Sequence, residues 1–208
     1  MIGLPAADTR PFDEVHAAQR TFRLLLNALS RPGTLETLSD RMPDVPCGVD
    51  PHVALVAFTL LDQEVRFATS GPAPARLAGY IARRTGARQA PPEEAGFLFA
   101  SGEDPDAPLA RLPVGSPEFP EQGGTAVLTV ERLSVKDDGD GPWSVMTLSG
   151  PGVAAMTQVH VRGLTGAVVD SFVDLNREYP LGIDALLIDL DGRVIGLPRT
   201  VRIVWDGR

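Results

Sequence analysis

The stretch "LLIDLDGRVIGLPRT" at residues 186–200 constrains the fold more than any other part of the sequence. Two apolar runs flank Asp191-Gly192. An Asp-Gly pair between such runs is the strongest short-range signal for a β-hairpin, because both residues of a two-residue turn need a positive φ. The sequence therefore predicts a strand over residues 186–190, a turn at Asp191-Gly192 and a strand over residues 193–197.

A two-residue turn also determines which residues face each other across the hairpin. It places Ile188 opposite Ile195 and, continued along the strands, Asp184 opposite Arg199. We expect Asp184 and Arg199 to form a structural ion pair, and cross-strand pairs of this kind contribute about 0.2–1 kcal/mol. Pro198 cannot donate to the ladder, so an edge or a bulge is expected there, and a bulge would shift the pairing.

The same stretch also has the form in which haloacid-dehalogenase phosphotransferases begin, with a nucleophilic aspartate after a buried strand. Asp189 would be that nucleophile. Too few residues follow it to form the α/β body of such an enzyme, and Arg193 stands where a small hydroxyl residue is expected. The hairpin interpretation is favoured, and Asp189 is not expected to act as a nucleophile.

Helical and strand patterns alternate early in the chain, and strands dominate later. Helices are predicted at residues 11–30, 51–62, 74–86 and 166–179, and strands at 64–70, 95–101, 125–133, 143–150 and 157–164. This order favours an α/β fold with a mixed sheet flanked by helices. Residues 102–124 are rich in Pro, Gly and acidic residues and are predicted to form a surface connection within a single domain spanning residues 1–208.

Charge and composition exclude several classes of partner. The net charge of −8 argues against nucleic-acid binding. No apolar run approaches the roughly 20 residues that span a bilayer, and the first residues lack the pattern of a secretory signal. The single cysteine, Cys47, excludes an internal disulfide and suits a reducing cytoplasm. We therefore expect a cytoplasmic protein without membrane or nucleic-acid partners.

Neither a metal ion nor pyridoxal phosphate is expected. His16, His52 and His160 are scattered, and no ligand spacing joins them to each other or to Cys47. The acidic "DDGDG" at residues 137–141 lacks the ligand spacing of a calcium loop. Pyridoxal-phosphate enzymes need a pocket lysine for the Schiff base. The only lysine, Lys136, lies in a polar, turn-like segment.

Four residues are candidates for a functional site. Arg31, at a predicted helix end, and Arg199, in "LPRT", could hold a phosphate or carboxylate with the planar guanidinium group. Asp62 and Glu64, in "LLDQEVRF", could form a pair of carboxylates for acid/base chemistry. Structural alternatives remain open for all four, because ion pairs and helix capping are more common roles for such residues.

Five segments together carry a resemblance to a known family. They are "QRTFRLLLNALSRPGT", "TLLDQEVRF", "LSGPGV", "YPLGIDALLID" and "LPRT". In this order they resemble the H subunit of the bacterial carbon–phosphorus lyase system, from about residue 12 to residue 204. Residues 87–124 are the least distinctive part of the match.

The resemblance implies a fold, a pathway and partners. The family's fold is a three-layer α/β/α sandwich like the large domain of pyridoxal-phosphate transferases, without the cofactor. The system breaks down phosphonates when phosphate is scarce, and the H subunit forms homodimers and joins the G, I, J and K subunits in a cytoplasmic core complex. The step linked to G, H and I, with L, replaces the adenine of a nucleoside triphosphate by a phosphonate to give a ribose 1-phosphonate 5-triphosphate. Displacement of the base is ascribed mainly to the I subunit, which implies a supporting role for the H subunit.

Two other interpretations stay open at this stage. The chain could be a stand-alone enzyme on a phosphorylated substrate, with Arg31, Arg199 and a carboxylate from Asp62, Glu64 or Asp184. It could also be a purely structural interaction module. Release of base by the purified chain alone would favour the stand-alone enzyme.

Overall fold

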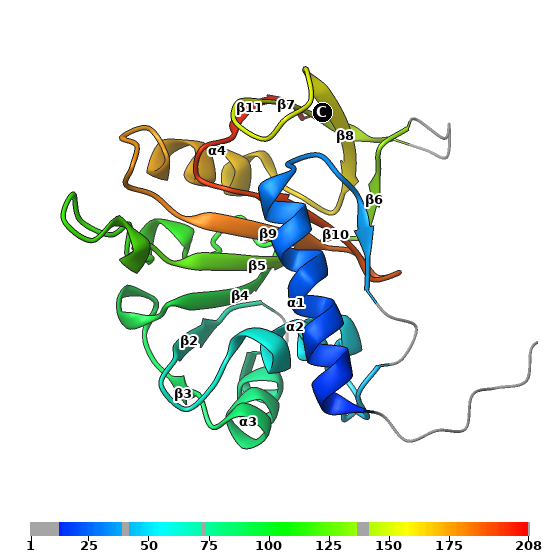
Figure 1. Cartoon of the computed structure of the whole chain (residues 1–208), viewed down its shortest axis with the longest axis vertical. Helices are drawn as coiled ribbons and strands as arrows, with labels where there is room; N and C mark the ends of the chain where they lie inside the picture. Colours follow the sequence, from blue (N-terminus) through cyan, green and yellow to red (C-terminus); the bar gives the residue numbers. More distant parts are fainter. Residues whose placement is uncertain (1–12, 39–41, 72–73, 137–141, 208) are drawn as a thin grey trace, which may run out of the picture.

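The computed structural model describes residues 13–38, 42–71, 74–136 and 142–207, and it contains two β-sheets (Figure 1). The larger sheet has the strand order β1-β10-β9-β5-β4-β2-β3. Its strands are β1 (Glu36–Thr37), β2 (Arg66–Thr69), β3 (Arg88–Gln89), β4 (Phe97–Ser101), β5 (Thr125–Thr129), β9 (Asp184–Ile188) and β10 (Arg193–Leu197). The smaller sheet has the order β11-β7-β8-β6, with β6 (Arg132–Ser134), β7 (Ser144–Ser149), β8 (Thr157–Arg162) and β11 (Arg202–Asp206).

The larger sheet is mixed, as the sequence predicts. The strands β3, β2, β4, β5 and β9 are parallel to one another, while the pairs β9–β10 and β10–β1 are antiparallel. Its central strands are apolar almost throughout because both of their faces are covered. The α/β class with a mixed sheet is therefore confirmed.

Three helices cover one face of the larger sheet (Figure 1). They are α1 (Glu14–Ser30), α2 (Pro51–Leu60) and α3 (Pro74–Thr85). Phe67, Phe99 and Val127, from three neighbouring strands, pack against these helices. α1 begins after its N-cap Asp13, whose side chain accepts a hydrogen bond from His16 N. The earlier start predicted at residue 11 lies outside the described residues, as does the acidic segment 137–141.

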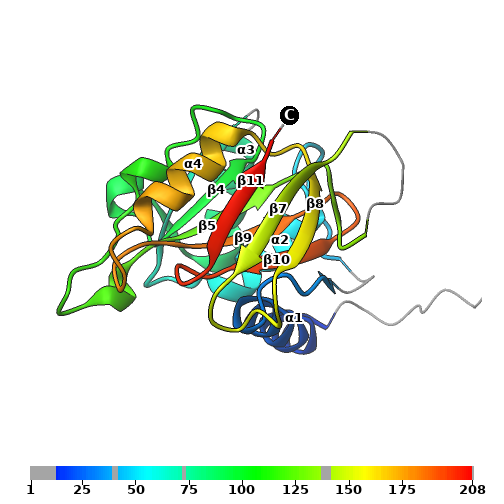
Figure 2. The ribbon, with the colours of Figure 1, turned by 90° about the horizontal axis from the view of Figure 1, so that it is seen from above.

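The opposite face is covered by the smaller sheet together with α4 (Gly166–Leu175) (Figure 2). Leu98, Leu128 and Leu187 of the larger sheet share one core with Met146 and Val161 of the smaller sheet. The three layers implied by the resemblance are present, but the second outer layer is mostly antiparallel sheet rather than helix. The strands of the smaller sheet alternate more buried with less buried residues, so that one face packs on the core and the other does not.

The segment predicted as a surface connection has structure of its own. It contains two short 3-10 helices, η2 (Leu109–Arg111) and η3 (Pro120–Gln122), and a third, η1 (Pro92–Glu94), precedes β4. Leu109 and Leu112 are buried in the core that the two sheets share. The connection therefore anchors itself to the fold through apolar side chains.

The hairpin exists, but its predicted register is wrong by one residue. Ile188 pairs with Val194 rather than with Ile195. The N–H of Asp189 donates to Arg193 O, and the N–H of Gly192 donates to Asp189 O (both 3.0 Å). The loop therefore has three residues and ends at Gly192, which has a φ of 77°. An Asp-Gly pair also serves this loop, in which only the glycine needs a positive φ.

None of the helices in the described part of the chain has the length and apolar character needed to cross a membrane.

Candidate functional site

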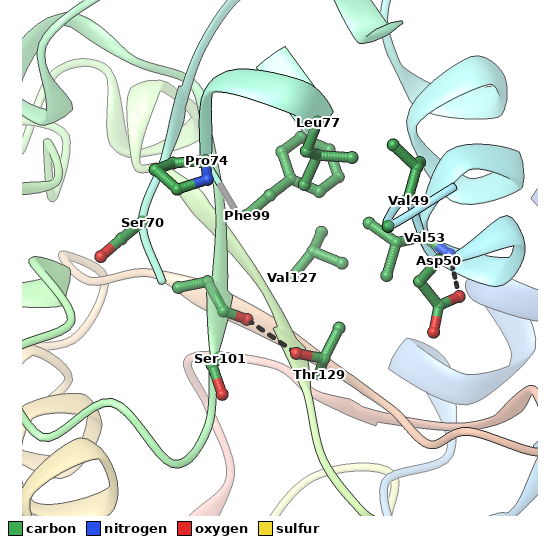
Figure 3. A pocket seen from close by; sticks show the side chains of 12 residues that line it. Val49, Asp50, Val53, Ser70, Pro74, Leu77, Phe99, Ser101, Val127 and Thr129 are labelled. Atoms are coloured by element: carbon green, nitrogen blue, oxygen red, sulfur yellow. Dashed lines mark hydrogen bonds between the residues drawn. The ribbon is translucent and has the colours of Figure 1, made fainter. Parts of the chain in front are cut away.

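A pocket of about 180 Å³ lies at the carboxyl ends of the parallel strands β2, β4 and β5 (Figure 3). The chain leaves β2 through α3, on one face of the sheet, and leaves β4 through η2, on the other face. The connections thus diverge between β2 and β4, which are neighbours in the sheet. In open α/β sheets, ligands bind in the crevice at such a switch point.

The inner wall of the pocket is apolar. Phe99 and Val127 form it from the sheet, Val53 from α2 and Leu77 from α3. Phe99 is held edge-on by Phe67, with ring centroids 6.4 Å apart. This wall favours an apolar or flat group on the ligand, because binding there removes apolar surface from water.

Three hydroxyl groups form the polar rim, one from the end of each strand. Ser70 follows β2, and its Oγ donates to Asp104 Oδ2 (3.0 Å). Thr129, which ends β5, donates through Oγ1 to the carbonyl of Ala100 (3.4 Å). Ser101 ends β4, and its Oγ accepts a hydrogen bond from a backbone N–H two residues further on (3.3 Å). The Ser101 hydroxyl proton is therefore free to donate to a ligand.

Among the described lining residues, one carries a carboxylate: Asp50, which is the N-cap of α2. Its Oδ1 accepts hydrogen bonds from His52 N (2.7 Å) and Val53 N (3.2 Å), and Pro51 occupies the first helical position. Asp and Pro in these positions are favourable at a helix start, as the sequence predicts. Because Asp50 already meets the positive end of α2, that helix end does not attract an anion.

The described lining residues suit binding better than acid/base catalysis. They pair no nucleophile with a base. Two surface carboxyl groups outside this lining have lowered pKa values. A hydrogen bond from His16 N lowers the pKa of Asp13, and a hydrogen bond from Arg111 lowers that of Glu93. Both carboxyl groups are exposed at the surface.

The sequence did not single out these hydroxyl residues. The only signal for them was a serine at the end of the predicted strands 64–70 and 95–101, while Thr129 lies inside the predicted strand 125–133. Each residue alone is ordinary. Only the order of strands in the sheet, which the sequence does not state, brings the three together.

The candidate acid/base residues Asp62 and Glu64 lie at the other end of α2 from the pocket. Both are exposed. Asp62 Oδ1 accepts a hydrogen bond from Glu64 N (2.9 Å), which is the turn-forming role common for aspartate. The structure brings neither residue to the pocket lining, and their catalytic role stays a prediction.

The two candidate arginines differ in their surroundings. Arg31 is the C-cap of α1 and is exposed, and its backbone N–H donates to Asn27 O (3.0 Å). The side chain of Arg199 is 13% exposed, and Arg199 binds the Asp184 carboxylate through Nη2 (2.8 Å) and through its own backbone N–H (2.8 Å). Arg199 Nη1 also donates to Pro120 O (2.6 Å). Asp184 and Arg199 thus form an ion pair, but in the observed register they are not opposite each other.

Several segments that carry the family resemblance meet in space. A Cβ at Gly152, in "LSGPGV", would lie 2.5 Å from Ser30 O at the end of α1. A Cβ at Gly150 would lie 2.9 Å from Thr200 O, in "LPRT". The loop after β7 is therefore pressed between these two segments, and glycine allows that close approach.

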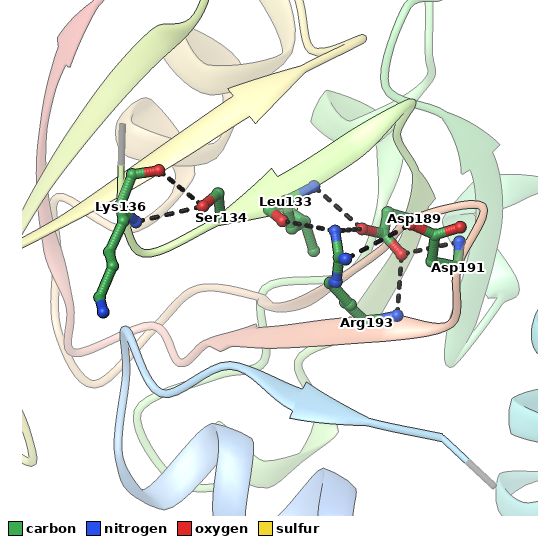
Figure 4. A network of polar contacts seen from close by, with 6 residues as sticks. All are labelled: Leu133, Ser134, Lys136, Asp189, Asp191 and Arg193. Atoms are coloured by element: carbon green, nitrogen blue, oxygen red, sulfur yellow. Dashed lines mark hydrogen bonds and ion pairs between the residues drawn. The ribbon is translucent and has the colours of Figure 1, made fainter. Parts of the chain in front are cut away.

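The Asp189 carboxylate accepts hydrogen bonds from the backbone around it (Figure 4). It is 1% exposed, and its Oδ1 accepts hydrogen bonds from Asp191 N (3.0 Å) and Arg193 N (2.8 Å). Its Oδ2 accepts from Leu133 N of β6 (3.0 Å), and Arg193 Nη1 lies 3.6 Å away. The carboxylate therefore closes the hairpin loop and connects it to the smaller sheet.

Lys136 is exposed in the segment after β6, where Ser134 Oγ accepts a hydrogen bond from its backbone N–H (3.1 Å) (Figure 4). Within the described residues, no group of three or more His, Cys, Asp or Glu side chains is placed to hold a metal ion.

Comparisons with known proteins cover nearly the whole chain. The family model described as bacterial phosphonate metabolism protein (PhnH) matches residues 11–204. The chain is also 35% identical over 189 residues to HtxG of Stutzerimonas stutzeri, a protein provisionally named as a C-P lyase subunit. That alignment covers 91% of this chain and 87% of the relative. The resemblance drawn from the five sequence segments is thereby confirmed, and the chain belongs to the bacterial phosphonate metabolism protein (PhnH) family.

Proposed function

We propose that this protein is a subunit of a carbon–phosphorus lyase system and that it supports the reaction without a complete active site of its own. The match to the phosphonate metabolism family over residues 11–204 is the main support for this proposal. The name of the relative HtxG as a C-P lyase subunit supports the same role.

The reaction we propose for the assembled system replaces the adenine of a nucleoside triphosphate by a phosphonate. The product is a ribose 1-phosphonate 5-triphosphate. The pocket at the ends of β2, β4 and β5 supports a binding role in this step, because it combines an apolar wall with hydroxyl groups. Its described lining offers one carboxylate, Asp50, which already caps α2.

We further propose that the chain forms a homodimer and joins the G, I, J and K subunits in the cytoplasm. The family match supports this proposal. The exposed apolar side chains Val15, Phe22 and Leu26 of α1 are compatible with a subunit that packs against other chains.

Growth on a phosphonate tests the proposed function. A bacterial strain with an otherwise complete carbon–phosphorus lyase system, but without its H subunit, is supplied with this chain and grown on methylphosphonate as sole phosphorus source. We expect growth to be restored. Growth on phosphate is the control for general fitness. Failure to grow on methylphosphonate, with the folded chain present in the cells, would count against the proposal.

A further inference from the structure

A second pocket, of about 700 Å³, lies where the loop after β7, the end of α4 and the turn before β11 meet. Its polar lining residues include Ser149, Asn176, Arg177, Tyr179, Arg199, Thr200 and Arg202. No carboxylate is among the described lining residues. Three arginines line the pocket, and two of them have a carboxylate partner outside the lining: Asp184 pairs with Arg199 and Asp174 with Arg177.

The three arginines differ in their partners and in their exposure. Arg199 is fixed from behind by Asp184 and by Pro120 O, so its guanidinium group is held in place before any ligand arrives. Arg202 is exposed on β11. Arg177 pairs with Asp174 (2.8 Å), but both side chains are more than half exposed. Surface pairs of this kind are weak, so Arg177 can exchange Asp174 for a ligand at little cost.

The side-chain amide of Asn176 has one hydrogen-bond donor without a partner. Its Oδ1 accepts a hydrogen bond from Ile183 N (2.8 Å), and because that backbone group can only donate, the orientation of the amide is fixed. The other end of the amide, Nδ2, is buried and has no hydrogen-bond partner. A buried donor left without an acceptor is unfavourable, and Asn176 lines the pocket.

A hydrogen bond and a close backbone contact fix the turn that precedes β11. The N–H of Val201 donates to Pro198 O (2.9 Å), which closes the turn that carries Thr200. Gly150 packs against that turn, and a Cβ there would lie 2.9 Å from Thr200 O. The hydroxyl groups of Ser149 and Thr200 therefore sit on a preformed frame beside the arginines.

We propose that this pocket binds a tetrahedral phosphorus oxyanion. Arg202 and Arg177 contact its oxygens directly, a shift of the Asn176 side chain lets the buried Nδ2 donate one hydrogen bond, and the Arg199–Asp184 pair holds the frame behind them. Guanidinium groups match such oxygens in geometry, and charge-assisted hydrogen bonds are the strong ones. Support for this site comes from its own lining residues and does not depend on the proposed function. Only the natural ligand rests on the proposed function, and it could be free phosphate, a phosphonate or an oligophosphate chain.

Calorimetric titration of the full chain tests the site, with inorganic phosphate, methylphosphonate and tripolyphosphate at one ionic strength. We expect saturable binding of at least one ion. The ion that binds most tightly indicates which class the natural ligand belongs to. Arg202→Gln, on an exposed strand position, should weaken that binding about tenfold or more. Asn176→Asp keeps the acceptor for Ile183 N but replaces the donor by a charged oxygen, so it should abolish binding.

Arg88→Gln is the matched control, because it removes one exposed arginine from β3, at the far edge of the larger sheet. It should bind as the unmodified chain does. Equal weakening by Arg88→Gln and Arg202→Gln would assign the effect to net charge and overturn the proposal. So would no binding of any of the three ions, or binding of a glutamate-rich peptide in their place. Growth on methylphosphonate tests the proposed function separately, so loss of this site would leave that proposal standing.

Discussion

Asp189 shows how a residue that suggests chemistry in the sequence can have a structural role in the fold. Its carboxylate is almost completely buried and accepts three backbone hydrogen bonds. The sequence predicts a turn there, and a turn is present. It could not predict that β6, more than fifty residues earlier, supplies one of the donors, because that contact depends on how the two sheets pack.

Asp189→Asn should lower the free energy of unfolding by about 1–3 kcal/mol. The amide replaces one carboxylate oxygen by an NH2 group, so a buried backbone N–H loses its acceptor and faces another donor. Asp191→Asn is the control, since Asp191 is exposed and asparagine suits the same loop. Urea denaturation of both variants measures the difference. A fully stable Asp189→Asn protein that no longer supports growth on methylphosphonate would instead favour a chemical role for Asp189.

Asp184 and Arg199 should depend on each other for their contribution to stability. Arg199 is mostly buried, so removal of Asp184 leaves a buried cation without its counter-charge. In a double-mutant cycle with Asp184→Asn and Arg199→Gln, we expect a coupling energy of about 0.5–3 kcal/mol. Additive effects of the two substitutions on the free energy of unfolding would contradict the observed contact.

At the scale of secondary-structure elements, the sequence predicts most helices and strands, but not their registers. The hairpin at β9 and β10 is an example. Alternative loops of two and three residues both accept Asp-Gly, and the choice between them shifts every pair along the strands by one residue. The pocket at the ends of β2, β4 and β5 was not predictable for a similar reason, because it depends on which strands are neighbours.

The contact between α1 and β10 should tolerate no larger residue at Gly196. A Cβ there would lie 2.5 Å from the backbone carbonyl carbon of Ala28 in α1. Gly196→Val should therefore destabilise the protein by about 1–3 kcal/mol or more, because the helix must move away from the sheet.

Gly79→Ala is the matched control, since the nearest atom to its added Cβ is 3.5 Å away in the flexible side chain of Arg83. It should stabilise α3 by about 0.5–1 kcal/mol. Thermal denaturation of both variants compares the two. Equal stability of Gly196→Val and the unmodified protein would contradict the packing of α1 on β10.

At the scale of the whole molecule, the two sheets share one core. The largest buried cluster contains residues of both sheets, of α4 and of η2. Composition and length suggested one domain, but they could not show how the later strands leave the first sheet and form a second layer on its face. That layer arises because β7, β8 and β11 each have one apolar face that must be buried.

The described part of the chain should therefore unfold as one cooperative unit. Both tryptophans, Trp143 and Trp205, lie in or beside the smaller sheet, so tryptophan fluorescence reports on that layer. Far-ultraviolet circular dichroism reports on the whole chain. In urea the two signals should change together. An earlier transition in fluorescence would show that the smaller sheet unfolds separately.

We propose that the protein supports a carbon–phosphorus lyase system as one of several subunits. The most direct measurement is release of adenine from a nucleoside triphosphate in the presence of methylphosphonate, by the purified subunits. The assay is run with all subunits, with all except this chain, and with this chain alone. We predict release only from the complete set. Equal release without this chain, or release by this chain alone, would contradict this supporting role.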